Sequence, residues 1–172
     1  MPSTGHYTDR LTPRRPSRRA PRESAGLLLH RTRDGVREVL LIHPGGPFWK
    51  RRDDGAWSIP KGEIEAGESP VEVARREFHE ELGAEAPDGE LRPLGSVRQA
   101  GGKVVHAWAA EGDFDPERIT SVPFEMEWPP RSGRKATFPE VDRAAWFDLQ
   151  TARRKILDAQ RSFIDRLEAT PA

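Results

Sequence analysis

Three glutamates on one edge of a predicted helix are the residues of this chain with the clearest capacity for chemistry. Glu77, Glu80 and Glu81 stand at i, i+3 and i+4, which places their side chains on one stripe of an α-helix. Carboxylates this close repel one another unless a positive charge lies among them. Hard divalent cations such as Mg²⁺ and Mn²⁺ prefer oxygen ligands of this kind. The stripe is therefore either a metal site or an ordinary solvated acidic face.

The helix that carries these glutamates has sequence signals at both ends. Ser69 is the predicted N-cap, Pro70 occupies the first helical position, and Glu72 completes a Ser-x-x-Glu capping box. Gly83 is placed to end the helix. The predicted core face of the helix comprises Val71, Ala74, Phe78 and Leu82.

A glycine-containing loop, residues 62–68, precedes the helix and can bring backbone groups close to a metal ion or a phosphate. Glu68 and Arg76 are placed to form an ion pair that ties this loop to the helix; two unrelated surface charges are the alternative. Lys61 stands directly before the loop and could contact a substrate phosphate, or could simply be a solvated lysine.

Residues 62–84 resemble the Nudix box, whose pattern is G-x5-E-x7-R-E-U-x-E-E-x-G-U with U an apolar residue. The fixed positions are filled by Gly62, Glu68, Arg76, Glu77, Phe78, Glu80, Glu81, Gly83 and Ala84. Ala84 is small where a larger aliphatic residue is usual. A motif defined at so many fixed positions is specific, unlike a lone glycine pattern.

The resemblance implies an α/β/α sandwich with a mixed central sheet. It also implies hydrolysis of a nucleoside diphosphate linked to a further group, X, with Mg²⁺ or Mn²⁺ as the cofactor. Carried over position by position, it makes Glu77, Glu80, Glu81 and the carbonyl of Gly62 the metal ligands. One of the helix glutamates, Glu77 or Glu80, can also serve as the base, and Glu68 with Arg76 is the structural pair of the box.

Outside the box, Glu140 precedes the predicted strand that carries Trp146. It resembles the additional glutamate that dinucleoside-polyphosphate hydrolases of the Nudix family place before a similar tryptophan. We expect Glu140 to be an additional metal ligand or the base. The other acidic candidates are Glu125, Glu127 and Asp142, and loop acidity without function is the alternative for all four.

Other candidates for substrate binding are basic and aromatic. A basic loop could grip a polyphosphate chain, although exposed arginines often have no function. Its residues are Arg131, Arg134 and Lys135. Tryptophans could stack on a nucleobase, with core packing as the default explanation for each. The candidates are Trp49, Trp108 and Trp128.

The remaining elements follow from the hydrophobic pattern. Apolar runs bounded by turn residues predict strands at 25–31, 37–43, 56–60, 91–99, 103–110 and 144–148. Asp34-Gly35 is a hairpin-type turn between the first two strands. Apolar residues at helical spacing predict a long C-terminal helix over residues 149–167. This order of elements indicates an α/β (α+β) sandwich, and we expect residues 25–172 to form a single domain.

The composition excludes several other classes of protein. The chain has 28 Lys and Arg and 28 Asp and Glu, and this neutral balance argues against a protein that mainly grips nucleic acid. The absence of cysteine excludes disulfides, thiolate metal sites and cysteine nucleophiles. We find no apolar run near the ~20 residues of a membrane-spanning helix and no apolar signal segment, so we expect a cytoplasmic protein without a membrane partner.

The first 24 residues differ from the rest of the chain. They contain six arginines and four prolines against Asp9 and Glu23, with little to bury, so we expect a disordered extension. An arm that docks to RNA, an acidic partner or a membrane is the alternative, and nucleic acid is expected as a partner only through this arm.

The leading hypothesis is therefore a metal-dependent Nudix pyrophosphohydrolase acting on a dinucleoside polyphosphate or a nucleoside triphosphate. ADP-ribose, other nucleotide sugars, capped RNA and diphosphoinositol phosphates are alternative substrates. A nucleotide sensor without catalysis is a second hypothesis, opposed by the presence of all three metal-binding glutamates. An interaction protein that docks through its arginine-rich N-terminus is the third.

Overall fold

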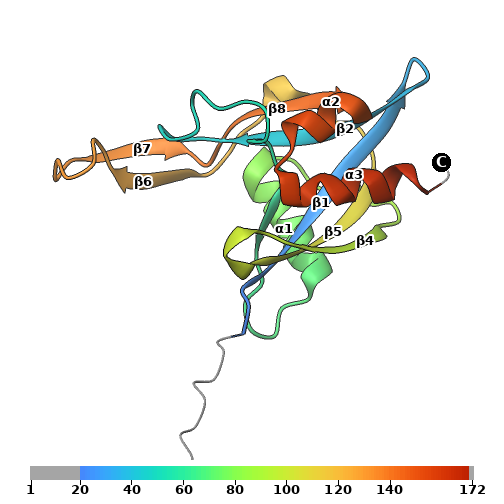
Figure 1. Ribbon diagram of the computed structural model, residues 1–172, viewed down its shortest axis with the longest axis horizontal. Coiled ribbons are helices and arrows are strands. Elements are labelled where there is room, and N and C mark those ends of the chain that lie inside the picture. The colour runs from blue at the N-terminus through green and yellow to red at the C-terminus, as the bar shows by residue number, and fades with distance from the viewer. Residues whose placement is uncertain (1–19, 171–172) are drawn as a thin grey trace, which may run out of the picture.

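A mixed sheet of six strands forms the centre of the computed structural model, which describes residues 20–170 (Figure 1). Its strands are β1 (Glu23–Arg33), β2 (Val36–Pro44), β3 (Lys61–Glu63), β4 (Arg92–Arg98), β5 (Val104–Glu111) and β8 (Val141–Asp148). The order across the sheet is β4-β5-β1-β2-β8, with β3 paired to β1. β1 runs parallel to β5 and antiparallel to β2 and β3, so the predicted mixed sheet is confirmed.

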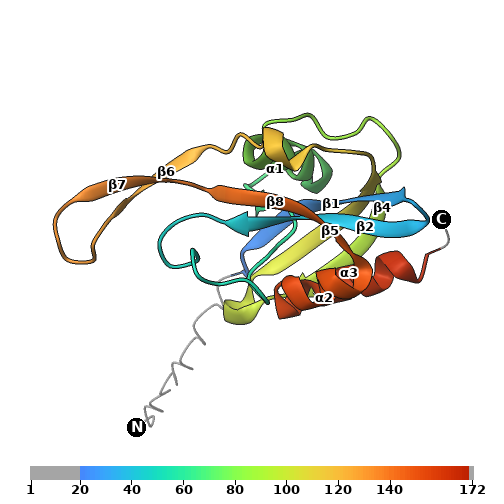
Figure 2. The ribbon, with the colours of Figure 1, turned by 90° about the horizontal axis from the view of Figure 1, so that it is seen from above.

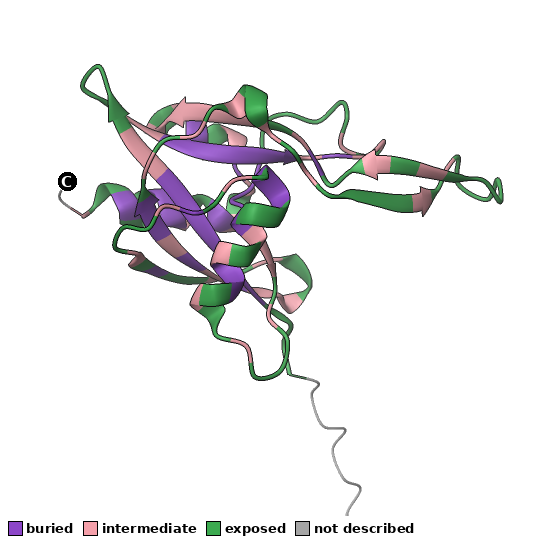
Figure 3. Cartoon of the chain, turned by 180° about the vertical axis from the view of Figure 1, so that it is seen from behind, coloured by how far each residue is buried: buried purple, intermediate pink, exposed green. Residues whose placement is uncertain are grey.

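Helices cover both faces of this sheet (Figure 2). They are α1 (Pro70–Leu82) on one face and α2 (Leu149–Lys155) and α3 (Arg161–Glu168) on the other. Alternation along β1 decides which side chain meets which layer: Leu27 and Leu29 pack with α1, whereas Leu28 packs with α2 and α3. The predicted α/β/α sandwich is therefore confirmed, and the buried strands run through its middle (Figure 3).

Two predicted hairpins form as expected. Asp34 and Gly35 have φ values of 50° and 77°, the positive pair that a two-residue type I′ turn requires between β1 and β2. β4 and β5 form the second antiparallel pair, around the glycines at 101 and 102.

The single helix predicted over residues 149–167 is wrong, because the chain divides it into α2 and α3. At the break the N–H of Leu157 donates to the carbonyl of Trp57 at 2.8 Å, and the N–H of Trp57 donates to the carbonyl of Lys155 at 3.0 Å. Ile156 is fully buried at this bridge. A backbone partner from a distant loop thus replaces the helical hydrogen bonds, and helical spacing alone does not reveal it. A short 3₁₀ turn, Asp158–Gln160, lies between the two helices. The described residues also contain 3₁₀ turns at Ala100–Gly102 and Pro116–Arg118.

Three smaller predictions also need correction. The strand predicted at 56–60 is reduced to single bridges, from Trp57 to Ile156 and from Ser58 to Ile42. Ser69 precedes α1 as predicted, but its side chain accepts no hydrogen bond from the described first turn, so the capping box does not form. On α1, Val73 is fully buried and Val71 only half-buried.

The sequence patterns missed a two-stranded sheet that projects from the body, formed by β6 (Pro123–Glu127) and β7 (Lys135–Pro139). The predicted N-terminal extension falls mostly on residues 1–19, outside the described residues, and β1 already begins at Glu23. In the part of the chain that is described, no helix is long and apolar enough to cross a membrane.

Candidate active site

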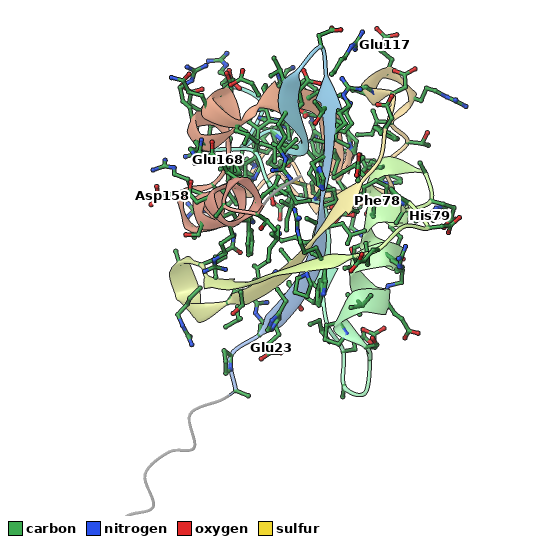
Figure 4. All side chains as sticks on the ribbon, turned by 90° about the vertical axis from the view of Figure 1, so that its right-hand side faces the viewer. Glu23, Phe78, His79, Glu117, Asp158 and Glu168 are labelled. Carbon is green, nitrogen blue, oxygen red and sulfur yellow. The ribbon has the colours of Figure 1, made fainter. Side chains whose placement is uncertain are left out.

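The site is built where β3 passes beside α1. The edge strand β3 is fixed by antiparallel pairing of Gly62 with Ala25 of β1, and α1 packs its apolar face on the same sheet. Phe78 faces the sheet and His79 lies on the outer side of the helix (Figure 4). The intervening loop and α1 therefore hold the box residues against the end of the sheet.

Glu81 is the most buried of the three helix glutamates. One carboxylate oxygen accepts a hydrogen bond from the backbone N–H of Lys61 at 2.9 Å, which ties the last turn of α1 to the first residue of β3. Burial raises the pKa of Glu81 to about 8, and the charges of Glu140 and Glu77 push it in the same direction, whereas Lys61 opposes them.

Glu77 is half-buried, and its carboxylate occupies the space where Gly62 lacks a side chain. Burial raises the pKa of Glu77, and the charges of Glu80 and Glu140 add to this effect while Arg76 opposes it. Glu80 is exposed on the same edge of α1. The positive charge near Glu77 and Glu81 is therefore too small to offset the burial and mutual repulsion that disfavour their ionised forms.

Arg76 of α1 lies beside the acidic edge of the helix, and its main ion-pair partner is Glu68. The two side chains form an ion pair, and a second oxygen of Glu68 accepts the N–H of Glu65 at 2.9 Å. Arg76 also lies 3.6 Å from an oxygen of Glu77 and 3.8 Å from one of Glu80. Because Arg76 is shared in this way, it ties the loop to the helix and only partly offsets the acidic edge.

A cavity of about 240 Å³ lies beside Glu81. Lys61, Glu81 and Glu140 supply its charged groups, and apolar side chains such as Trp49, Ile59 and Leu157 supply most of the rest. Burial lowers the pKa of Lys61, an effect that the charges of Glu81, Glu77 and Glu140 oppose. The structure thus brings Lys61 and Glu140, two residues distant in sequence, to the same hollow as Glu81.

The donor set can be compared with the needs of a hard divalent cation. In the range 20–170, no three acidic or histidine side chains converge closely enough to hold an ion as they stand. The available groups are nevertheless oxygen donors, and a cation would relieve the mutual repulsion that disfavours ionised Glu77 and Glu81. The donor atoms are therefore of the chemical type that Mg²⁺ and Mn²⁺ prefer.

Unlike Lys61, the basic residues of the predicted phosphate-binding loop do not line this cavity. Arg131 and Arg134 lie in the turn between β6 and β7, at the far end of the projecting hairpin from α1 (Figures 1 and 2). Lys135 begins β7 and pairs with Glu125 at 2.9 Å. Glu127, the last residue of β6, accepts the N–H of Gly133 at 3.1 Å.

The other candidates occupy different surroundings. Asp142 pairs with the buried ring of His43 at 2.7 Å, and the other ring nitrogen of His43 lies 2.7 Å from the carbonyl oxygen of Arg52. Trp49 lines the cavity, Trp108 packs with the core under α1, and Trp128 contacts Phe48. No recognisable motif includes His43 or Phe48. The Gly/Pro-rich stretch before Phe48 predicts a loop, and the strand end at His43 predicts a structural residue.

Several known proteins are similar to this chain. An RNA pyrophosphohydrolase of Francisella tularensis subsp. mediasiatica is 38% identical over 60 residues, which cover 34% of this chain and 39% of that protein. An 8-oxo-(d)GTP phosphatase of Mycolicibacterium smegmatis is 44% identical over 85 residues, which cover 46% of this chain and 24% of that protein. The chain thus spans less than half the length of these curated relatives.

Solved structures share the fold. A C. elegans Ap4A hydrolase in a binary complex has a TM-score of 0.59 at 23% identity, covering 86% of this chain and 96% of that one. The NUDIX domain of Shewanella oneidensis NrtR complexed with ADP ribose has a TM-score of 0.59 at 19% identity, covering 88% of each chain. The family model described as NUDIX domain matches residues 20–167, and the chain belongs to the Nudix family.

Proposed function

We propose that this chain is a metal-dependent pyrophosphohydrolase that cleaves a phosphoanhydride in a nucleoside diphosphate linked to a group X. The observation that carries the proposal is the buried carboxylate of Glu81, fixed by the N–H of Lys61 in one wall of a cavity that also holds Glu140. Membership of the Nudix family and the names of its relatives, an RNA pyrophosphohydrolase and an 8-oxo-(d)GTP phosphatase, support the same reaction class.

Glu77, Glu80, Glu81 and the carbonyl of Gly62 would hold Mg²⁺ or Mn²⁺. When bound, the cation supplies charge neutralisation for the phosphoryl oxygens and the leaving group. The side chains around the cavity would bind the substrate and hold the loop in position. Lys61 lines the cavity, and its amine can contact a phosphate oxygen. Arg76 holds the loop against α1 through Glu68 and so keeps Gly62 beside Glu77.

Glu140 is the group we assign to the attacking water. Its backbone is held on both sides, because its N–H donates to Val122 at 3.1 Å and its carbonyl accepts from Gly45 at 2.9 Å. The exposed carboxylate stands at the rim of the cavity, where it can take a proton from water as the new P–O bond forms and the anhydride bond breaks. Glu77 and Glu80 are the alternative bases.

For the substrate we propose a dinucleoside polyphosphate or a nucleoside triphosphate, with Lys61 on the phosphate chain. Arg131, Arg134 and Lys135 would reach that chain only if the projecting hairpin bends toward α1. We further propose a cytoplasmic location, since such nucleotides are cytoplasmic metabolites and the chain contains no cysteine.

The test is a substrate screen with product identification. The purified chain is incubated with Mg²⁺ or Mn²⁺ and dinucleoside polyphosphates, nucleoside triphosphates, ADP-ribose or capped RNA, and matched reactions contain EDTA. We expect two phosphate-containing products from at least one nucleotide and no products in EDTA. Failure to cleave any phosphoanhydride with either metal would remove the proposed reaction.

A further inference from the structure

A second hollow, with a volume of about 790 Å³, lies between residues 46–52 and the β6–β7 hairpin. We call it the aromatic groove. Its ring-bearing residues are Phe48, Trp128 and Phe138, and its basic residues are Lys50, Arg51 and Arg52. None of these residues takes part in the site described above, so the groove needs its own explanation.

The rings of the groove are arranged as an open aromatic surface. Phe48 and Trp128 meet edge to face, with ring centroids 5.4 Å apart and an interplanar angle of 87°. Phe48 nevertheless remains 60% exposed, which is unusual for a large apolar side chain that already has an aromatic partner. Phe138 continues the surface along the hairpin, where it packs against Phe124 at 6.1 Å. A flat apolar ligand could therefore stack in the groove without displacing a core residue.

The charges beside these rings are positive and largely uncompensated. Lys50 and Arg51 are exposed and form no ion pair with any residue in the described range 20–170. The acidic residues that follow them are engaged elsewhere: Asp53 pairs with Lys155, and Asp54 pairs with Arg154 and Lys155. The acidic residue that lines the groove, Asp142, is already paired with His43. The groove thus combines a stacking surface with free cations, which suits an aromatic base that carries phosphate.

The aromatic groove and the cavity at Glu81 are neighbours on opposite sides of one loop. Trp49 lines the cavity and the preceding Phe48 lines the groove; in the facing segment, Glu140 lines the cavity and Pro139 the groove. The backbone between them is closed tightly, because the N–H of Gly45 donates to the carbonyl of Glu140 at 2.9 Å. Two hollows therefore flank a single segment of backbone; Trp49, Glu81 and Glu140 line one, and Phe48 and Trp128 line the other.

The cavity alone is too small for a whole dinucleotide. Its volume of about 240 Å³ lies below the roughly 300–1,000 Å³ of sites that enclose drug-sized ligands, so it suits a single ring system. A substrate with an aromatic base at each end of its phosphate chain would use both hollows. A substrate with one base would leave the groove unfilled.

We propose that the aromatic groove binds the second nucleobase of a dinucleoside polyphosphate, which stacks on Phe48 and Trp128 while Lys50 and Arg51 contact the adjoining phosphates. This inference rests on the proposed function and narrows it, because it selects the two-base substrate over the nucleoside triphosphate. In this proposal the groove selects the substrate and takes no part in cleaving the phosphoanhydride bond.

The test compares two ligands on the full-length chain. Phe48→Ala, Trp128→Ala and the double variant Lys50→Ala/Arg51→Ala are assayed with diadenosine tetraphosphate and with ATP. We expect each variant to raise KM for diadenosine tetraphosphate about tenfold, in line with the loss of one base stack or two phosphate contacts, with kcat nearly unchanged. KM for ATP should change less than twofold. Val36→Ala and Arg33→Ala, at the β1–β2 turn on the other side of the body, serve as the apolar and basic controls.

Binding without turnover separates this inference from the proposed function. The dissociation constant of diadenosine tetraphosphate is measured by calorimetry in EDTA for the wild type and for Phe48→Ala, whose mostly exposed site should tolerate the change. A tenfold weaker complex for the variant would support the groove even if the chain hydrolysed neither ligand. Unchanged KM and dissociation constant in all groove variants, or equal losses for ATP and diadenosine tetraphosphate, would overturn it while leaving the hydrolase proposal intact.

Discussion

A β-carbon added to Gly62 would lie 1.9 Å from the carboxyl carbon of Glu77, closer than any two non-bonded atoms can approach. Gly62 is therefore required by the position of a carboxylate, since its backbone does not adopt a positive φ. The glycine of the box and the first glutamate of its acidic edge are two parts of one packing arrangement.

This contact predicts the result of Gly62→Ala. The methyl group must push the carboxylate of Glu77 out of place, and a displacement of about 1 Å in such a site costs about 100-fold in rate. We expect kcat to fall by about that factor, while circular dichroism shows a folded protein. Gly89→Ala is the matched control, because its added carbon would meet no atom within 4 Å. Equal activity of the two variants would show that the position of Glu77 does not matter for turnover.

Glu81→Gln removes the ability of this side chain to ionise while keeping an oxygen that can accept the N–H of Lys61. If this oxygen holds the metal, we expect turnover to fall by ~100-fold or more. Glu72→Gln, an equal change on the exposed first turn of α1, should leave turnover within twofold of the wild type. The measurement is steady-state hydrolysis across a range of Mg²⁺ concentrations. A Glu81→Gln variant with normal turnover would exclude Glu81 from the site.

The raised pKa of Glu81 also predicts how metal-free stability depends on pH. An unfolded glutamate titrates near 4.5 and the buried Glu81 near 8, so between these values the folded state holds a proton that the unfolded state releases. The contribution of Glu81 to the free energy of unfolding is therefore full below about pH 4.5 and is lost as the pH rises through about 8. In EDTA, the thermal midpoint of the wild type should fall relative to that of Glu81→Gln between pH 5 and pH 8.

Magnesium provides the internal control for this titration. A bound cation favours the ionised carboxylate. Added Mg²⁺ should therefore reduce the fall in the thermal midpoint of the wild type between pH 5 and pH 8, and it should leave the thermal midpoint of Glu81→Gln nearly unchanged. If the thermal midpoints of the two proteins in EDTA change in parallel with pH, burial does not raise the pKa of Glu81.

The parts of the structure that the sequence reveals are those fixed by local patterns. The turn at Asp34 and Gly35, the helix between Pro70 and Gly83, and the spacing of its glutamates all depend on neighbouring residues, and each is present. The predicted order of elements likewise agrees with the sandwich, in which the apolar run Leu27–Leu29 is covered on both faces of the sheet. These features give the fold class and the acidic edge.

The remaining parts depend on contacts between distant segments. The burial of Glu81 beneath Lys61 changes an apparently solvated acidic stripe into a partly enclosed one, and helical periodicity carries no information about it. The approach of Glu140 to that cavity depends on its backbone contacts with Val122 and Gly45. In the β6–β7 hairpin, β6 begins with a proline, β7 ends with one, and the apolar face is half-exposed. The sequence pattern that would predict these strands is therefore weak.

Ile156 tests how much such a long-range contact contributes to the free energy of unfolding. It is fully buried where the chain leaves α2 to pair with Trp57, so Ile156→Ala should lower the free energy of unfolding by about 2–5 kcal/mol through lost packing and a residual cavity. Arg154→Ala, two residues earlier and exposed, should change it by less than about 0.5 kcal/mol. Urea denaturation measures both values. A small effect at Ile156 would mean that the bridge to Trp57 does not hold α2 and α3 in place.

Glu140 is the residue that we propose as the base for the attacking water. It lies at the rim of the cavity, and its charge acts on Glu81, Glu77 and Lys61 without a fixed partner of its own among the described residues. A general base typically contributes ~100- to 10,000-fold, so Glu140→Gln should lower kcat by about 100-fold or more while KM changes little. Glu125→Gln, a loss of the same charge on the projecting hairpin, is the control and should keep kcat within twofold. If kcat survives in Glu140→Gln, the proton must go to Glu77 or Glu80 on α1, and the same substitution at each of those positions identifies which one accepts it.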